Sequence, residues 1–549
     1  MPMITKSKPE YHSRRSPVLG TRGMVAASQP LAVAAGLEIL SLGGNAADAA
    51  VATAAALNVT EPTSTGLGGD CFALYFNSGD HVVSALNGSG RSPASLTLQR
   101  LAREGFHKEL PPFHPYTITV PGACAGWCDL VDEYGRLEMS QVLAPAIRLA
   151  EEGFPVAPLT AYFWSRGVEK QLREAPGGLE LTINGNAPQP GEIFRNPGLA
   201  RTFRTVAESG KEAFYQGPIA ESIAHVVETA GGCLGISDLA NHQSTWENPI
   251  STTYRGLRIW ECPPNGQGLA ALLALNILEG FDLTALSPLS SRRLHLEIEA
   301  LRLAFADTSW YVADPVFNPA PLDMLLSKEY AAERRRLIDP DKATLNQQHA
   351  APTSGSDTVY LSVVDNQCNA CSFINSNYMG FGTGIVPSGW GFSLQNRGHT
   401  FRLDPEHPNA LAPGKRPYHT IIPAMATLPG PDGSHELYAS FGVMGGFMQP
   451  QGHLQVVVAM VDDQLDPQQS LDQQRFCISD GEAGGAVSLE DGISLADIDG
   501  LIALGHDITI VSGHERALFG RGQIIQRDST SGVLCAGSDP RADGCAMTL

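Results

Sequence analysis

The pattern of apolar residues changes from mainly helical to mainly strand-like at one polar stretch, and this change limits the folds that the chain can adopt. Residues 333–357 are first charged and then rich in Pro, Ser and Gly, ending in APTSGSD, which is typical of a linker. Before it, helical patterns dominate residues 137–153, 197–230 and 294–315. After it, a helix is expected over residues 450–462, and alternating, strand-like runs cover residues 359–364, 370–377, 391–395, 437–443 and 508–512. Apolar strands flanked by helices on both sides of the linker predict an α/β protein in which sheets are covered by helices.

Small residues dominate the region that follows the N-terminal segment. The alanine-rich run over residues 46–58 predicts a tightly packed helix. Glycines at positions 66, 68 and 69 then lead into an apolar strand over residues 71–76, and another strand is expected over residues 81–90. Because this glycine cluster precedes a strand and not a helix, close backbone packing is a better interpretation than phosphate binding.

Length and charge exclude several classes of protein. A chain of 549 residues is longer than one hydrophobic core usually serves. Its net charge of -20 argues against non-specific binding to nucleic acid or to an anionic membrane. Residues 1–20 read as a flexible tail without the apolar core of a secretory signal, and no apolar run is long enough for a transmembrane helix. These features predict a cytoplasmic protein with neither nucleic acid nor a membrane as partner.

The ten cysteines give little evidence of a metal or disulfide framework. Cys368 and Cys371 form the one C-x-x-C pair, and they fall where a hairpin turn is expected. Without a second pair or nearby histidines this is a weak zinc signal, so no metal site is predicted.

Thr358 stands directly after the linker and opens a strand-like run. A threonine at the start of a chain carries its own base, because its α-amino group, with a pKa of roughly 7.7–8.0, can take the proton from its hydroxyl. The position therefore suggests cleavage of the bond between Asp357 and Thr358, with Thr358 as nucleophile. The alternative is an ordinary strand-opening threonine, since β-branched residues favour strands.

Several segments, in order along almost the whole chain, resemble the γ-glutamyltranspeptidase family. They are residues 24–76, TVPGACAGW at 119–127, LHLEIEALRLAFAD from 294, DTVYLSVVD from 357, GFGTGIVPSGWGF, PGKRP at 413–417 and VMGGFMQPQGH at 443–453. The resemblance implies an N-terminal-nucleophile (Ntn) hydrolase, a four-layer αββα sandwich made as a self-cleaving precursor. Residues 21–357 would form the large subunit and residues 358–549 the small one.

The resemblance also implies a set of catalytic residues. Thr358 matches the family's nucleophile, and Ser376 matches a hydroxyl that hydrogen-bonds to it. Gly445 and Gly446 match the pair whose backbone N–H groups bind the oxyanion. Many members have a second threonine after the nucleophile, whereas this chain has Val359.

The positions that hold the substrate depart from the family's usual pattern. Arg91 is the candidate for the arginine that binds the substrate carboxylate, although it stands two residues later than in the family. Thr400 replaces the aspartate that holds the α-amino group, and Arg397 replaces a glutamine. The remaining substitutions place Tyr378 for an asparagine, and His419 and Thr420 for paired serines. Loss of the aspartate would leave a buried substrate ammonium without its partner, so the pocket suits an acidic acyl group that has no free amine.

Three functional hypotheses follow. The first is an autoprocessed amidohydrolase or acyltransferase that cleaves γ-glutamyl amides such as glutathione and transfers the acyl group to water or an amine. The second keeps the fold and the nucleophile but takes a small acidic amide of the oxamate or glutaryl type. The third is an unprocessed binding protein without activity. None requires a cofactor, and the expected partners are a small amide and the two subunits of one precursor.

Overall fold

Two large antiparallel sheets form the centre of the molecule. The computed structural model describes residues 15–344, 358–430 and 433–549. In order across the first sheet, the strands are β1 (Val18–Gly20), β18 (Leu534–Ser538), β17 (Arg521–Arg527), β13 (His435–Met444), β12 (Ala424–Pro429), β9 (Leu257–Glu261) and β8 (Ile250–Tyr254). Across the second they are β19 (Cys545–Thr548), β2 (Met24–Ala27), β10 (Val359–Val364), β11 (Ala370–Ser376), β3 (Asp70–Asn77), β4 (Val82–Gly88) and β7 (Thr245–Glu247).

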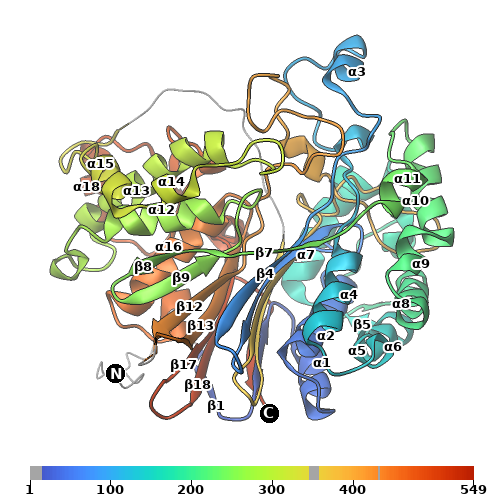
Figure 1. Cartoon of the computed structure of the whole chain (residues 1–549), viewed down its shortest axis with the longest axis horizontal. Helices are drawn as coiled ribbons and strands as arrows, with labels where there is room; N and C mark the ends of the chain where they lie inside the picture. The colour runs from blue at the N-terminus through green and yellow to red at the C-terminus, as the bar shows by residue number, and fades with distance from the viewer. Residues whose placement is uncertain (1–14, 345–357, 431–432) are drawn as a thin grey trace.

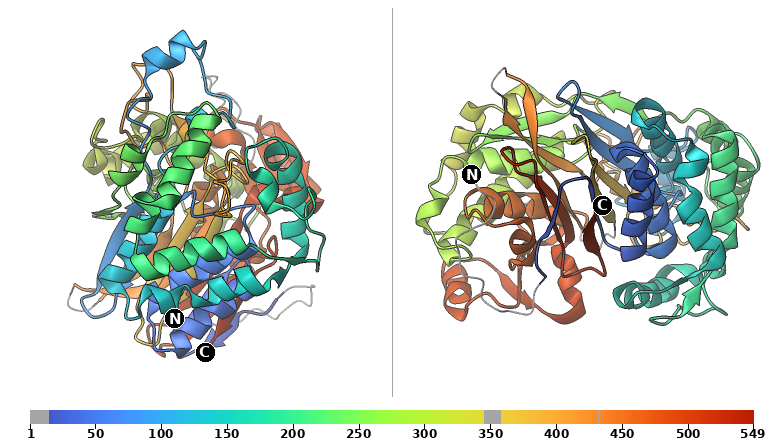
Figure 2. Two further views of the ribbon diagram at one scale, coloured as in Figure 1. Left: turned by 90° about the vertical axis from the view of Figure 1, so that its right-hand side faces the viewer. Right: turned by 90° about the horizontal axis from the view of Figure 1, so that it is seen from below.

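The sheets pack face to face, and helices cover both outer faces (Figures 1 and 2). Phe72, Tyr360 and Ile374 of the second sheet meet Met425 and Ile525 of the first in the core between them. The helices over the second sheet include α1 (Pro30–Ser41), α2 (Ala46–Thr60), α4 (Ala123–Tyr134), α6 (Ala144–Glu152) and α8 (Pro197–Ser209). Those over the first sheet include α12 (Gly268–Leu278), α13 (Ser291–Tyr311) and α16 (Met448–Val461). The predicted four-layer αββα sandwich is therefore confirmed.

Helix α2 shows how the sequence produces this layering. Asn45 and Asp48 form a reciprocal capping box at its start, and every residue of the helix is buried. A helix enclosed on all sides cannot be amphipathic, and alanine lets the second sheet and the outer helices approach it closely. The alanine-rich run was therefore a reliable guide to both the element and its burial.

Most elements lie where the sequence predicts them, with two differences. Residues 391–395 do not form a strand, because they lie in a buried loop that packs its backbone against Gly68. Val18–Gly20, at the end of the predicted flexible tail, forms strand β1 and pairs with β18. Residues 1–14 lie outside the described residues. Among the described helices, none has both the length and the hydropathy needed to cross a bilayer.

Candidate active site

Three polar side chains lie in a row at one end of the second sheet. Strands β10 and β11 pair with Val359 opposite Asn375, so the next step of the register sets Thr358 opposite Ser376. On the other side of β11, Ser376 pairs with Asp70 of β3. Directly opposed residues of antiparallel strands point to the same face. Thr358, Ser376 and Asp70 therefore share the face that the first sheet covers, and all three are buried.

The hydroxyl of Ser376 is the centre of a hydrogen-bond network. Thr358 Oγ1 donates to Ser376 Oγ over 3.1 Å, and the backbone N–H of Tyr378 donates to the same oxygen over 2.8 Å. Arg397 Nη2 lies 3.3 Å from it, while Arg397 Nη1 donates to Thr420 Oγ1 over 2.7 Å. The predicted nucleophile is thus connected through one serine to a guanidinium group.

Arg397 is enclosed without a carboxylate beside it. Its side chain is fully buried, and its guanidinium carbon lies 4.3 Å from the centre of the Tyr378 ring. Tyr378 itself has a φ of 80°, a left-handed conformation that is strained for a bulky residue. Burial lowers the pKa of Arg397 to about 10, against weaker opposing effects of Asp70 and Tyr378. The group remains a cation at neutral pH, but it is poorly solvated.

His419 is a neutral partner of Asp70. Its Nε2 lies 3.0 Å from an Asp70 carboxylate oxygen, and its Nδ1 accepts from the backbone N–H of Ile421 over 3.3 Å. That arrangement requires the proton on Nε2, where it is donated to the carboxylate. Burial lowers the pKa of His419 to about 3, with nearby Arg397 acting in the same direction. His419 therefore does not add positive charge to the site.

Gly445 and Gly446 lie in the turn that joins β13 to α16. Their φ angles are 139° and 61°, which glycine adopts without strain. Neither backbone N–H donates to another described residue. The turn also leads into the N-terminus of α16, whose partial positive charge favours an anion.

Contacts between the sheets place this turn toward Thr358. Ser362 Oγ donates to Ser440 Oγ over 2.6 Å, and a Cβ on Gly442 would lie 2.5 Å from the ring of Tyr360. Ser362 therefore faces Ser440, and Tyr360, two residues earlier in β10, faces Gly442, two residues later in β13. The next step sets Thr358 toward the end of β13, where the glycine turn begins.

Gln267 connects the glycine turn to the arginine. Its Nε2 donates to Thr420 O over 2.6 Å and to Gly446 O over 2.8 Å, and its Oε1 accepts from the Tyr418 hydroxyl. The side chain is fully buried, at the N-terminus of α12. One amide therefore fixes the spacing between the two backbone segments that border the site.

Comparison with known proteins decides the family. The γ-glutamyltranspeptidase family model matches residues 32–549. This chain belongs to the γ-glutamyltranspeptidase family. A glutathione hydrolase-like YwrD proenzyme of Bacillus subtilis is 37% identical, over 97% of this chain and 99% of that protein. An oxamate amidohydrolase proenzyme of Klebsiella pneumoniae is 34% identical, over 96% and 98%. The solved structure of a cephalosporin acylase from Bacillus halodurans is 45% identical, covers 100% of this chain and 99% of that one, and has a TM-score of 0.91.

Membership of the γ-glutamyltranspeptidase family makes this chain an enzyme with the Ntn-hydrolase fold. The relatives divide between a glutathione hydrolase-like protein, an oxamate amidohydrolase and a cephalosporin acylase, so their names differ in substrate.

Two of the predicted substrate residues, Arg91 and Thr400, have no hydrogen bond to Ser376 or to the Arg397 guanidinium among the described residues. Arg91 is partly exposed and donates to Gln243 O over 3.4 Å. The Thr400 hydroxyl lies 2.7 Å from Tyr418 O and 2.9 Å from Arg397 O, so it stabilises the loop that carries the arginine. The structure thus brings together Thr358, Ser376, Tyr378, Arg397, His419 and Thr420, with Gly445 and Gly446 connected through Gln267. Asp357, the other half of the predicted cleavage site, lies outside the described residues.

Sequence reasoning did not identify Asp70 or Gln267. Asp70 follows the glycine cluster, which proved to be a place of close packing: a Cβ on Gly68 would lie 2.0 Å from Ser393 O, and one on Gly69 would lie 2.2 Å from Ser376 O. An acidic residue that opens an otherwise apolar strand was the available signal for Asp70. Gln267 had no signal beyond a short turn-like run, PPNGQG.

Proposed function

We propose that this enzyme is an autoprocessed amidohydrolase or acyltransferase whose nucleophile is Thr358 and whose acyl substrate carries a carboxylate bound by Arg397. The observation that carries the proposal is the state of Arg397. It is a fully buried cation, it is linked to Thr358 through Ser376, and no carboxylate of a described residue forms an ion pair with it. A substrate carboxylate would supply the missing negative charge through a charge-assisted hydrogen bond.

Activation begins with the precursor itself. Thr358 Oγ1 attacks the carbonyl carbon of Asp357, the peptide C–N bond breaks, and the acyl group moves from nitrogen to oxygen. Water then hydrolyses this ester, which leaves a carboxylate on Asp357 and a free α-amino group on Thr358. Only after this step does the nucleophile have its own base. Ser376 accepts a hydrogen bond from the attacking hydroxyl and keeps it oriented.

Turnover repeats the same attack on the substrate amide. The α-amino group of Thr358 takes the proton from the hydroxyl, the oxygen adds to the amide carbon, and the N–H groups of Gly445 and Gly446 receive the oxyanion. The amine leaves with the transferred proton, and water or a second amine attacks the acyl ester. Gln267 holds the carbonyl of Gly446, which keeps this peptide segment in place.

The charge around the site favours an acyl group without an α-amino group. Asp70 is the carboxylate nearest to this network, but it already accepts from Gln395, His419 and the backbone N–H groups of Gly90 and Gly122. A substrate ammonium would have to displace one of these donors and would lie near the Arg397 cation. Glutaryl amides and oxamate avoid this cost, and their carboxylate fits the arginine.

A γ-glutamyl amide is the second candidate. The glutathione hydrolase-like relative favours it, since it is similar to this chain along almost its whole length. Two chromogenic substrates that differ in one group separate the candidates. We expect a higher kcat/KM for glutaryl-p-nitroanilide than for γ-glutamyl-p-nitroanilide, and the reverse order would refute the des-amino proposal.

Cleavage is tested on a denaturing gel. We expect the intact band of 58.4 kDa to give two fragments, the smaller with 549 − 357 = 192 residues and Thr358 at its N-terminus by Edman sequencing. Thr358→Ala should remain one band and be inactive, whereas Thr358→Ser should retain some cleavage. Thr509→Ala, at an exposed strand threonine, is the control. Cleavage that persists in Thr358→Ala would exclude Thr358 as the nucleophile of processing.

A further inference from the structure

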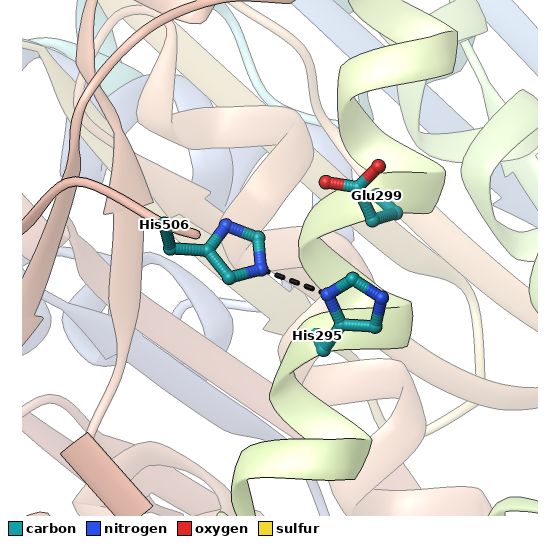
Figure 3. A group of neighbouring side chains, drawn as sticks. All are labelled: His295, Glu299 and His506. Atoms are coloured by element: carbon teal, nitrogen blue, oxygen red, sulfur yellow. Dashed lines mark hydrogen bonds between the residues drawn. The ribbon is translucent and has the colours of Figure 1, made fainter. Parts of the chain in front are cut away.

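A second cluster of ionisable side chains lies on the outer side of the first sheet, away from Thr358. His295 and Glu299 stand one turn apart on α13, and His506 lies in the loop between α18 (Leu495–Ala503) and β16 (Ile508–Val511) (Figure 3). One ligand atom from each of the three lies within 4.8 Å of the others, and all three side chains are buried. The i, i+4 spacing puts both helix residues on the face toward His506.

The hydrogen bonds show that His295 Nδ1 and Glu299 Oε1 are the acceptor atoms of this cluster. His295 Nε2 lies 2.8 Å from the carbonyl oxygen of Asp339, which can only accept, so the proton of a neutral His295 is on Nε2. Its Nδ1 therefore carries a lone pair and lies 2.8 Å from His506 Nε2. Glu299 Oε2 accepts from the backbone N–H of Thr344 over 3.0 Å, while its Oε1 has no hydrogen-bond partner among the described residues.

We propose that His295, Glu299 and His506 form a binding site for a zinc ion. Two imidazoles and one carboxylate are a common zinc ligand set, and three protein ligands leave one tetrahedral position for water. Metal-binding histidines usually donate their other N–H to a carbonyl, as His295 does to Asp339. The two nitrogen ligands select zinc over magnesium or calcium, which prefer oxygen.

Zinc binding requires the three ligand atoms, which lie within 4.8 Å of one another, to rearrange around the ion. Two nitrogens on one tetrahedral zinc at about 2.05 Å are about 3.3 Å apart, so the pair of histidines must open slightly. His506 then moves its proton to Nδ1, which has no hydrogen-bond partner among the described residues. A residue in a loop can make this movement at less cost than one within α13.

Arg302 lies close enough to Glu299 to weaken the binding of zinc. Its Nε lies 3.5 Å from Glu299 Oε1, so the guanidinium competes with a cation for that oxygen. Its other nitrogens donate to Ala483 O and Gly485 O, which hold it at this distance. Removing the charge should therefore strengthen zinc binding, an effect opposite to that of a substitution that damages the fold.

The site would connect the two halves of the enzyme. His295 and Glu299 precede the proposed cleavage point, and His506 follows it. Thr344, whose backbone N–H donates to Glu299, lies within the predicted linker of residues 333–357 and is the last described residue before the proposed cleavage point. Zinc would therefore join the large and small subunits beside this part of the chain. Zinc binding does not depend on cleavage, so it is measured on both the wild-type protein and Thr358→Ala.

The test is metal content and affinity in tag-free protein. The protein is stripped with a chelator, dialysed against zinc and analysed by ICP-MS, and affinity is measured by calorimetry. We expect one zinc per chain, little or no magnesium or calcium, and a higher melting temperature with zinc. His506→Gln and Glu299→Gln should weaken binding by more than about 100-fold, since loss of an outer-shell partner alone costs about 10- to 100-fold.

Two further variants make the result decisive. His225→Gln removes an exposed histidine and should keep full stoichiometry. Arg302→Gln should bind zinc more tightly than the wild type. Wild-type protein that takes up no zinc would refute the site, as would unchanged affinity in both ligand variants. Failure here leaves the role of Thr358 untouched, because the gel and Edman measurements test it separately.

Discussion

Replacing Arg397 with methionine separates stability from substrate binding. The substitution keeps an unbranched side chain of similar length and removes the charge. At 1.36 kcal/mol per pKa unit, the fall of the Arg397 pKa from its ordinary value to about 10 corresponds to about 3 kcal/mol of unfavourable burial. Loss of the hydrogen bonds to Ser376 and Thr420 costs about 1 kcal/mol each. Loss of the contact between the guanidinium and the Tyr378 ring costs about 2 kcal/mol more. These contributions nearly cancel, so the free energy of unfolding of Arg397→Met should change by no more than about 1 kcal/mol.

The kcat/KM of Arg397→Met should fall for a substrate that carries a carboxylate. A hydrogen bond to a charged group contributes about 1.5–3 kcal/mol. Its loss should lower kcat/KM for glutaryl-p-nitroanilide by about 10- to 150-fold. For butyryl-p-nitroanilide, which lacks the carboxylate, the same variant should lose much less. The ratio of the two losses isolates recognition of the carboxylate, because both substrates use the same nucleophile and the same oxyanion site.

Both quantities are measured on cleaved protein of matched concentration. Urea denaturation gives the free energy of unfolding, and release of p-nitroaniline gives kcat/KM. Arg402→Met, at an exposed arginine of the following loop, is the control and should change neither. Equal losses on the two substrates would show that Arg397 supports the nucleophile and not the substrate carboxylate, and this would refute the proposed specificity.

Three further outcomes are expected from the hydrogen bonds around the site. Ser376→Ala leaves the N–H of Tyr378 without its acceptor, so it should cost about 1–3 kcal/mol of stability and slow both precursor cleavage and turnover. Gln267→Leu leaves the carbonyl of Gly446 unpaired, so it should lower kcat by about 10-fold or more with a smaller effect on KM. The pKa of His419 in the folded protein, about 3, lies below its value in the unfolded chain. Between about pH 6.5 and about pH 3 the unfolded chain therefore binds one more proton, and the free energy of unfolding falls as the pH falls. His419→Gln, which keeps an N–H donor, should make this fall shallower in urea titrations.

Each of these outcomes has a result that contradicts it. Ser376→Ala that matures and turns over at the wild-type rate would remove the serine from the mechanism. An increase in KM alone in Gln267→Leu would mean that the amide shapes substrate binding and not the oxyanion site. An unchanged pH dependence in His419→Gln would mean that other buried groups, such as His242, whose pKa burial also lowers to about 3, account for the acid limb.

Sequence reasoning performed well where one local pattern decides the structure. The alternating run after Thr358 became β10 with the same bounds, and the helical run predicted over residues 294–315 is α13 as far as Tyr311. It failed at residues 391–395, where an apolar alternation lies in a buried loop and not in a sheet. Burial alone can produce such a pattern, because a loop enclosed by the core needs apolar side chains as a strand does.

The active-site residues also divide into those that the sequence can indicate and those whose place depends on tertiary contacts. The position of Thr358 after a linker pointed to it from the residues alone, whereas Ser376 came only from the family resemblance, and the structure sets the two at the ends of paired strands. Asp70 could not be predicted, because its place beside Ser376 depends on the order of strands in the sheet. The strained φ of Tyr378, which sets its ring against Arg397, also depends on tertiary contacts that no local pattern encodes.

The origin of the site residues along the chain has a consequence for the mature enzyme. Asp70 and Gln267 precede the proposed cleavage point, whereas Thr358, Arg397 and Gly446 follow it. The Gln267 amide is the direct link between the arginine's partner Thr420 and the glycine turn, so a residue before the proposed cleavage point aligns two segments that both follow it. In the second sheet, β10 pairs with β11 from Val359 onward and with β2, which precedes the cleavage point, from Leu361 onward. Cleavage before Thr358 would therefore leave the proposed nucleophile at the start of a strand that is paired on both sides within three residues.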